Sequence, residues 1–133
     1  MLKPCKLNLI TSADGQEASF SKEARFELSE NGAAVFYADS EAEVSLYFYA
    51  DGVRIAREGD YSLRLTLKTG KETEGMLGIA GAQGAVGVFT HKADYRIGKN
   101  SLISMLEYDL LMSGGVQKMK VRLAARGEDS EEK

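Results

Sequence analysis

Short stretches in which apolar and polar residues alternate recur along almost the whole chain. Residues 63–68 are the clearest example, because leucine occupies every second position and polar side chains lie between. Strand side chains point to opposite faces with a period of two, so this pattern predicts half-buried strands rather than helices. The same alternation indicates about nine strands, near residues 4–12, 17–29, 33–38, 43–50, 53–58, 61–69, 84–96, 101–112 and 116–125.

Turn residues separate these strands at short intervals. The strongest hairpin signals are Asp14-Gly15, Asn31-Gly32 and Asp51-Gly52, because Asn, Asp and Gly tolerate the positive φ of tight turns. Sequential hairpins favour an up-and-down meander, and closure of the sheet removes its two exposed edges. We therefore expect an all-β fold, a closed or nearly closed antiparallel up-and-down β-barrel of about eight to ten strands, either filled with side chains or holding one small ligand.

One segment departs from the strand pattern. Glycine recurs at every third position from Gly75 to Gly87. The run lacks the proline of collagen and does not have the spacing of a phosphate-binding loop. We interpret it as a flexible or kinked connection that leads into the strand at Val86.

Length and composition indicate one domain, which we place at residues 1–125, followed by an acidic, disordered tail at residues 126–133. The net charge of −3 and the absence of a Lys/Arg cluster argue against nucleic-acid binding. No apolar stretch is long enough for a membrane helix, and the N-terminus lacks the apolar core of a secretory signal. The single cysteine, Cys5, cannot form an internal disulfide, so we expect a cytoplasmic protein with Cys5 buried on the first strand.

No catalytic, metal-binding or nucleotide-binding motif stands out, so we lean against an enzyme and expect no cofactor and no metal. His91 is the only histidine, and with Cys5 it gives too few ligands for a zinc site. Asp94 lies on the opposite strand face from His91, where it cannot orient the imidazole. Glu107 and Asp109 share one face, as an acid/base pair would, although such residues more often form a solvated face.

Arg57 and Tyr108 are the residues that we predict to bind a ligand. If Val53 and Ile55 point inward, Arg57 shares their face, and an arginine inside a barrel must pair with a carboxylate or bind an anion. Tyr108 lies on the opposite face of its strand from the two carboxylates. The leading hypothesis is a non-enzymatic module that binds a small apolar or anionic ligand.

Tyr47 and Tyr49 suggest an alternative. They share one strand face, while Val44, Leu46 and Phe48 form the other, so both faces of this strand are partly apolar. Exposed aromatic surface often marks a partner site, although tyrosine also has a high intrinsic preference for strands. The alternative is a filled barrel that acts as an interaction or structural protein, a homodimer joined through Tyr47 and Tyr49.

Three segments resemble the YwiB-like family of uncharacterised bacterial proteins. The first, residues 45–60, resembles its strand, Asp-Gly-like turn and hydrophobic-x-Arg-x-Gly segment, which Ile55, Arg57 and Gly59 match. Residues 84–90 resemble its Gly-x-apolar-x-apolar-x-Thr strand, and residues 106–110 its late Tyr-x-apolar strand. The resemblance covers roughly residues 7–123 and implies a lipocalin- or calycin-like β-barrel. It implies no particular activity.

Overall fold

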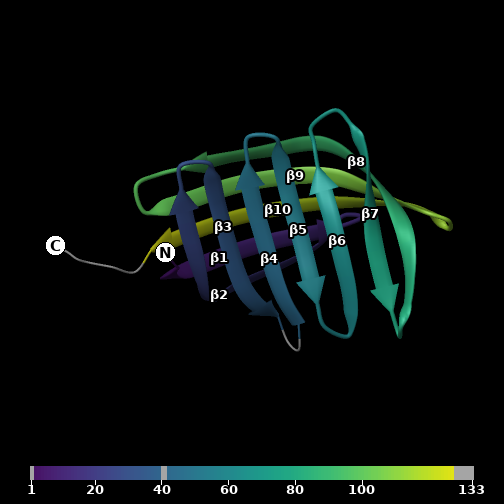
Figure 1. Cartoon of the computed structure of the whole chain (residues 1–133), viewed down its shortest axis with the longest axis horizontal. Coiled ribbons are helices and arrows are strands. Elements are labelled where there is room, and N and C mark those ends of the chain that lie inside the picture. Colours follow the sequence, from purple (N-terminus) through teal and green to yellow (C-terminus); the bar gives the residue numbers. More distant parts are fainter. Residues whose placement is uncertain (1, 40–41, 128–133) are drawn as a thin grey trace.

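The computed structural model describes residues 2–39 and 42–127, which form ten antiparallel strands (Figure 1). Each strand pairs with its neighbours in the chain, and β1 closes the ring against β10. The strands are β1 (Lys3–Ala13), β2 (Gln16–Ser29), β3 (Gly32–Asp39), β4 (Ala42–Tyr49), β5 (Gly52–Glu58), β6 (Tyr61–Leu67), β7 (Glu72–Ile79), β8 (Ala82–Ile97), β9 (Ser101–Met112) and β10 (Gly115–Gly127). The predicted all-β, up-and-down closed barrel is confirmed.

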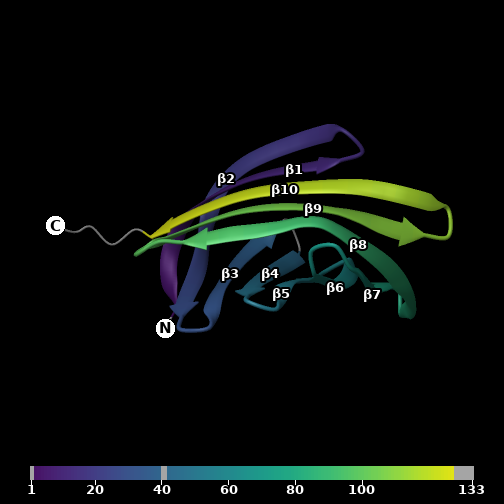
Figure 2. The ribbon, with the colours of Figure 1, turned by 90° about the horizontal axis from the view of Figure 1, so that it is seen from above.

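The barrel is flattened into two layers whose strands cross steeply. Figures 1 and 2 show β3 to β7 in one layer and β8, β9, β10 and β1 in the other. The long strands β2 and β8 connect the layers, because each pairs with a different neighbour along its two halves. In β2, Gln16–Phe26 pair with β1 and Arg25–Ser29 pair with β3.

The alternating side chains divide as the sequence predicts, with the apolar set turned inward. In β4, Val44, Leu46 and Phe48 are buried, while Ser45 and Tyr47 between them are half-buried and Glu43 before them is exposed. Cys5 is fully buried on β1, as expected. Burial of each large apolar side chain stabilises the fold by about 1.5–3 kcal/mol, so this inner face holds the barrel together.

Tight turns close one end of the barrel. Gly32 and Gly52 follow the predicted hairpin turns with φ of 155° and 145°, conformations that side chains rarely adopt. A Cβ on Gly32 would lie 1.9 Å from the Phe48 carbonyl oxygen, and one on Gly52 would lie 2.6 Å from that of Leu67. Beneath these turns Phe48, Val53, Leu67 and Leu102 are all 0% exposed. We call these four residues the closed end.

The structure corrects the interpretation of the glycine-rich segment. Residues Glu72–Ile79 form strand β7, which pairs with both β6 and β8. A Cβ on Gly75 would lie 2.6 Å from the Arg64 carbonyl oxygen and 2.8 Å from Leu65 Cδ2. At Gly75, glycine therefore permits the close approach of β6 to β7 rather than flexibility, and the expected connection was wrong.

The end of the barrel domain also differs slightly from the prediction. Strand β10 continues through Arg126 to Gly127, which pairs with Cys5, so two residues assigned to the tail belong to the sheet. The remaining tail residues, 128–133, lie outside the described residues. No helix within residues 2–39 and 42–127 has the length and hydropathy needed to cross a membrane.

Candidate functional site

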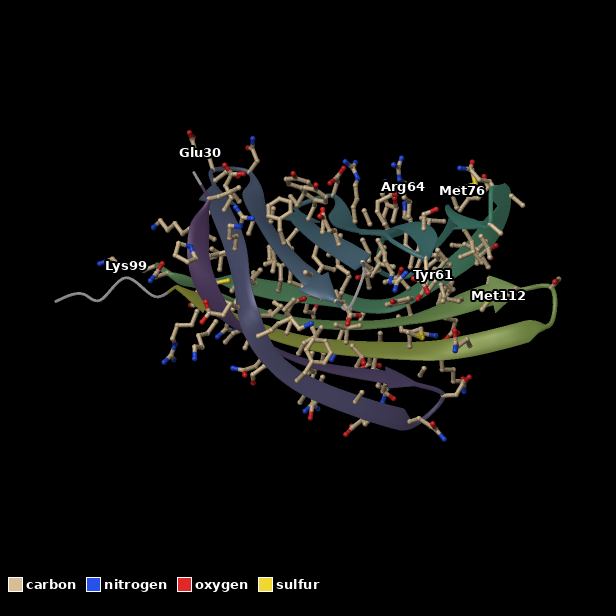
Figure 3. The ribbon with its side chains drawn as sticks, turned by 90° about the horizontal axis from the view of Figure 1, so that it is seen from below. Glu30, Tyr61, Arg64, Met76, Lys99 and Met112 are labelled. Carbon is tan, nitrogen blue, oxygen red and sulfur yellow. The ribbon has the colours of Figure 1, made fainter. Side chains whose placement is uncertain are left out.

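The opposite end of the barrel leaves inward-facing apolar side chains uncovered. Leu63 and Leu65 face the core, so Tyr61, on the same side of β6, also faces inward. Tyr61 is nevertheless 37% exposed, and its register partner Ile79 is 55% exposed. In Figure 3, which views the molecule from the side of the β3–β4 and β5–β6 turns, Tyr61 lies between the layers while Arg64 and Met76 lie outside.

Arg57 lies beside Tyr61 on the same inner face. Its Cα partners are Val44 and Leu63, both of which pack in or against the core. Arg57 Nη1 donates hydrogen bonds of 3.0 Å to Asp60 Oδ1 and 3.0 Å to the Tyr61 carbonyl oxygen. The guanidinium also stacks on the Tyr61 ring, 3.8 Å from its centroid.

The Arg57–Asp60 pair is only half shielded from water. The Arg57 side chain is 17% exposed, whereas that of Asp60 is 71% exposed. The hydrogen bond from Arg57 holds the pKa of Asp60 below its ordinary value. Because exposed ion pairs contribute little to stability, Asp60 orients the arginine without binding it strongly.

Two further tyrosines complete the cluster from distant strands. Burial raises the pKa of Tyr37 to about 12; the Asp39 carboxylate adds to the rise and Arg57 opposes it. Burial also raises the pKa of Tyr108 well above its ordinary value, and Tyr37 and Tyr61 add to that rise. Tyr37 and Arg57 are both Cα partners of Val44, and Arg57 contacts Tyr61. Together with the effects of Tyr37 and Tyr61 on Tyr108, this register defines one neighbourhood of Tyr37, Arg57, Tyr61 and Tyr108, which we call the barrel mouth.

Lys22 adds a second positive charge next to the barrel mouth. Its Nζ donates a 2.8 Å hydrogen bond to the Ala38 carbonyl oxygen and lies 3.8 Å from Asp39 Oδ1. The same Nζ is 4.4 Å from the centroid of Phe20 and 5.5 Å from that of Tyr37. Cations and aromatic rings thus alternate from β2 to β6 along this part of the inner wall.

The structure brings the two predicted ligand-binding residues, Arg57 and Tyr108, into the same cluster. Tyr37 and Tyr61 were not predicted as their neighbours from the sequence. The available signal was strand parity, because Tyr37 shares a strand face with Val35 and Tyr61 with Leu63 and Leu65. Ligand binding by Arg57 and Tyr108 stays a prediction.

Tyr47 and Tyr49 lie on the outer wall, as their alternation with core residues requires. Their rings stack 6.3 Å apart at 13°, and Phe36 packs edge-on against Tyr47 at 5.8 Å. Arg54 lies 5.9 Å from the Tyr49 ring. The two tyrosines border a groove of about 470 Å³ with Met76. A homodimer through this surface stays a prediction.

His91 has a carboxylate partner, Asp109, that was not predicted from the sequence. A β-bulge between Thr90 and Lys92 leaves His91 on the outer wall, with Nε2 2.9 Å from Asp109 Oδ2. His91 is half exposed, and its ring packs edge-on against Phe89. Residues 2–39 and 42–127 contain no group of three or more His, Cys, Asp or Glu able to hold a metal.

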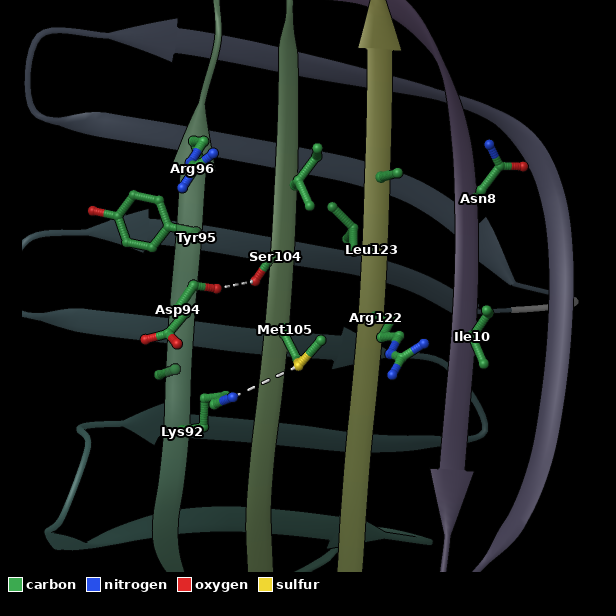
Figure 4. Close-up of a pocket in the computed structure, with 13 residues that line it drawn as sticks. Asn8, Ile10, Lys92, Asp94, Tyr95, Arg96, Ser104, Met105, Arg122 and Leu123 are labelled. Atoms are coloured by element: carbon green, nitrogen blue, oxygen red, sulfur yellow. Dashed lines mark hydrogen bonds between the residues drawn. The ribbon is translucent and has the colours of Figure 1, made fainter.

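A larger groove, of about 850 Å³, lies on the outer wall of β8, β9, β10 and β1 (Figure 4). Figure 4 shows Lys92, Asp94 and Arg96 along one side and Arg122 on the other, with Met105 between. Lys92 Nζ lies 3.9 Å from Met105 Sδ. This groove presents three cations and one carboxylate to solvent. Neither Arg57 nor Tyr108 lines it.

The fold and the site define a class of protein: a closed, up-and-down β-barrel of ten strands with an aromatic and basic mouth. A family model described as a domain of unknown function (DUF1934) matches residues 6–123, so the chain belongs to the DUF1934 family. The chain is also similar to a solved structure, the crystal structure of the ywiB protein from Bacillus subtilis. That match has a TM-score of 0.81 and 13% identity, and covers 96% of this chain and 94% of that one.

The structural match supports the predicted resemblance to YwiB-like proteins, and at 13% identity it shows the fold alone. No curated protein matches the chain. The family is one of unknown function, so any activity must be argued from the barrel itself.

Proposed function

We propose that the protein is a non-enzymatic binding module that holds a small ligand with an apolar body and an anionic group in the barrel mouth. The observation that carries the proposal is Arg57, a cation on the inner face of the barrel that stacks on Tyr61 and shares the Cα partner Val44 with Tyr37, with Tyr108 in the same neighbourhood. A charge on an inner face is costly unless it has a partner. A ligand anion would complete the partial pairing that Asp60 provides.

The hydrogen bonds of Arg57 leave donors available. A guanidinium carries five N–H donors in a fixed fork that matches a carboxylate or phosphate. Within the described part of the chain, Arg57 donates side-chain hydrogen bonds through Nη1 alone. Because Asp60 is largely exposed, a ligand anion can replace it at little cost.

The tyrosines supply both an apolar surface and hydroxyl donors. Since burial raises the pKa of Tyr108 and Tyr37, both phenols keep their protons at neutral pH and can donate to an anion. The exposed faces of Tyr61 and Ile79 can cover an apolar ligand body, at about 25 cal/mol for each Å² removed from water. The combination favours an amphipathic anion over a purely apolar or purely charged ligand.

A fluorescence titration with 8-anilinonaphthalene-1-sulfonate, an aromatic anion, tests the proposal. We expect saturable binding that octanoate displaces more effectively than octanol, because only octanoate carries a charge. Arg57→Met should weaken binding by about 10- to 100-fold, the value of one charge-assisted hydrogen bond of roughly 1.5–3 kcal/mol.

Arg54→Met is the matched control, because Arg54 is on the same strand but is exposed on the outer wall. It should bind the probe like the wild type. Equal affinity in wild type and folded Arg57→Met, or equal displacement by octanoate and octanol, would contradict the proposal. Circular dichroism of each variant verifies that the barrel is folded.

A further inference from the structure

One stretch of β2 has a pairing partner on one side only. Gln16–Ala24 pair with β1, whereas the pairing of β2 with β3 begins at Arg25. Among the described residues, Gln16–Ser21 therefore present a free strand edge. Figure 2 shows the β1–β2 hairpin leading away from β3 and β4, so the closed barrel has an open seam here.

This edge is accessible and carries few of the features that usually prevent strand addition. Gln16, Glu17, Ala18, Ser19 and Ser21 are all exposed, and Phe20 is half-buried. Natural edges are commonly protected by proline, a bulge or inward-pointing charge. The register of β2 with β1 is unbroken from Gln16 to Phe26, so no bulge interrupts it.

An inward-pointing charge appears only where the free edge ends. Lys22 turns toward the inner wall and donates to the Ala38 carbonyl oxygen. Its side chain bridges β2 to β3 close to Arg25, where the pairing of the two strands ends. The unprotected length is therefore limited to the segment from Gln16 to Ser21, long enough for a strand of ordinary length.

We propose that this edge pairs with the same edge of a second copy of the chain, antiparallel and centred on Ser19. Antiparallel pairing is self-complementary under a two-fold axis. Directly opposite residues point their side chains to the same face of the sheet. A two-fold pairing must therefore set odd-numbered residues opposite odd-numbered ones and even-numbered residues opposite even-numbered ones.

The charges on β2 favour the register centred on Ser19 over the neighbouring register centred on Phe20. With Ser19 opposite Ser19, Glu17 meets Ser21 and Ala18 meets Phe20. A register centred on Phe20 instead sets Glu17 directly opposite Glu23, and like charges in that position are destabilising. In the Ser19 register, the inner face gains an apolar Ala18–Phe20 contact on each side of the axis.

Position-specific disulfide trapping tests both the pairing and its register. Cys5 is fully buried and is the only cysteine in the chain, so Ser19→Cys adds one accessible thiol. Opposite residues of an antiparallel pair have Cα atoms about 4.5–5.5 Å apart, within the usual span for a disulfide of roughly 4.4–6.8 Å. We expect Ser19→Cys to form a disulfide-linked dimer rapidly under mild oxidation.

Glu17→Cys is the matched control. In this register Glu17 lies opposite Ser21 of the second copy, so the two Glu17 positions are separated by four residues along the strand, about 13 Å. It should not crosslink to itself, but a mixture of Glu17→Cys and Ser21→Cys chains should form the mixed dimer. Crosslinking of Glu17→Cys as fast as Ser19→Cys, or no crosslinking of Ser19→Cys, would overturn the proposal.

Light scattering of the chain without cysteine substitutions provides an independent measurement. The backbone N–H groups of neighbouring strand residues point to opposite sides of the strand, and proline has no N–H. Of the two variants Ala18→Pro and Ser19→Pro, one therefore loses an N–H at the free edge. The other loses an N–H that pairs with β1. We expect a dimer in the wild type and a stable monomer in the edge-facing variant.

A surface elsewhere gives a different result in the same measurement. If Tyr47 and Tyr49 join the copies, Tyr47→Ser/Tyr49→Ser becomes monomeric and both folded proline variants remain dimeric. That result, or a wild-type monomer at the highest concentration reached, refutes pairing through β2.

Discussion

The closed end and the barrel mouth are built from the same alternating strands but are covered differently. At the closed end Phe48, Val53 and Leu67 are 0% exposed, and the Phe48 ring lies 5.5 Å from that of Tyr95 in the opposite layer. Near the mouth, Tyr61 and Ile79 face the same interior but are 37% and 55% exposed. Alternation decides which way a side chain points, whereas the opposite layer decides whether it is buried.

The largest expected effect of a substitution is at the closed end. Phe48→Ala should lower the free energy of unfolding by about 3–5 kcal/mol, because it removes a fully buried ring and leaves a cavity. The matched change near the mouth, Tyr61→Ala, should cost only about 1 kcal/mol, chiefly the lost contact with Arg57. Urea unfolding followed by circular dichroism measures both values.

Equal losses in the two variants would remove the distinction between the ends. A Tyr61→Ala loss as large as that of Phe48→Ala would mean that the mouth is a packed part of the core. The proposed ligand site would then have no accessible surface.

An intermediate effect is expected at the glycines of β7 and β8. Gly75→Ala should cost about 1–3 kcal/mol, because its Cβ would lie 2.6 Å from the Arg64 carbonyl oxygen. Gly84→Ala is the control: it has no atom within 4 Å of its Cβ and should be neutral or stabilise by up to about 1 kcal/mol. Urea unfolding measures both changes in the free energy of unfolding. Equal values for the two variants would mean that β7 is the flexible connection expected from sequence.

The smallest effect appears only at high pH. Burial raises the pKa of Tyr108, so the native state keeps its phenol proton at a pH where the unfolded chain has lost it. The stability from the neutral phenol is complete below pH of about 10 and is lost as pH rises toward the native pKa. Each pH unit above 10 should cost about 1.4 kcal/mol for this group.

Tyr108→Phe should remove that part of the slope. Urea unfolding at a series of pH values above 10 measures it, with tyrosinate absorbance as a parallel record. Identical slopes in wild type and Tyr108→Phe would show that the Tyr108 phenol is not shielded from solvent.

Most of the fold could be predicted from sequence because the signals are local. Asp14-Gly15, Asn31-Gly32 and Asp51-Gly52 each lie at a hairpin connection, and Asp14 itself has a positive φ of 52°. Strand β7 was missed because Gly75 reflects the approach of a neighbouring strand. That approach is a property of the assembled sheet and leaves no local pattern in the chain.

The candidate site was predicted in part, for the same reason. Parity with Val53 and Ile55 placed Arg57 on the inner face, where the structure also has it. Its neighbours Tyr37 and Tyr108 come from β3 and β9, and only closure of the barrel brings them together. His91 likewise meets Asp109 rather than Asp94, because a bulge and a cross-strand pairing bring them together.

The sequence by itself determined the strands, their inward and outward faces and most of the turns, because strand periodicity and turn geometry depend on neighbouring residues. The tertiary structure decided which inward side chains are covered, which tyrosines lie near Arg57 and which length of β2 has no strand partner among the described residues. Those outcomes depend on how far each strand extends across the opposite layer. That extent is fixed by the packing of segments distant in the chain.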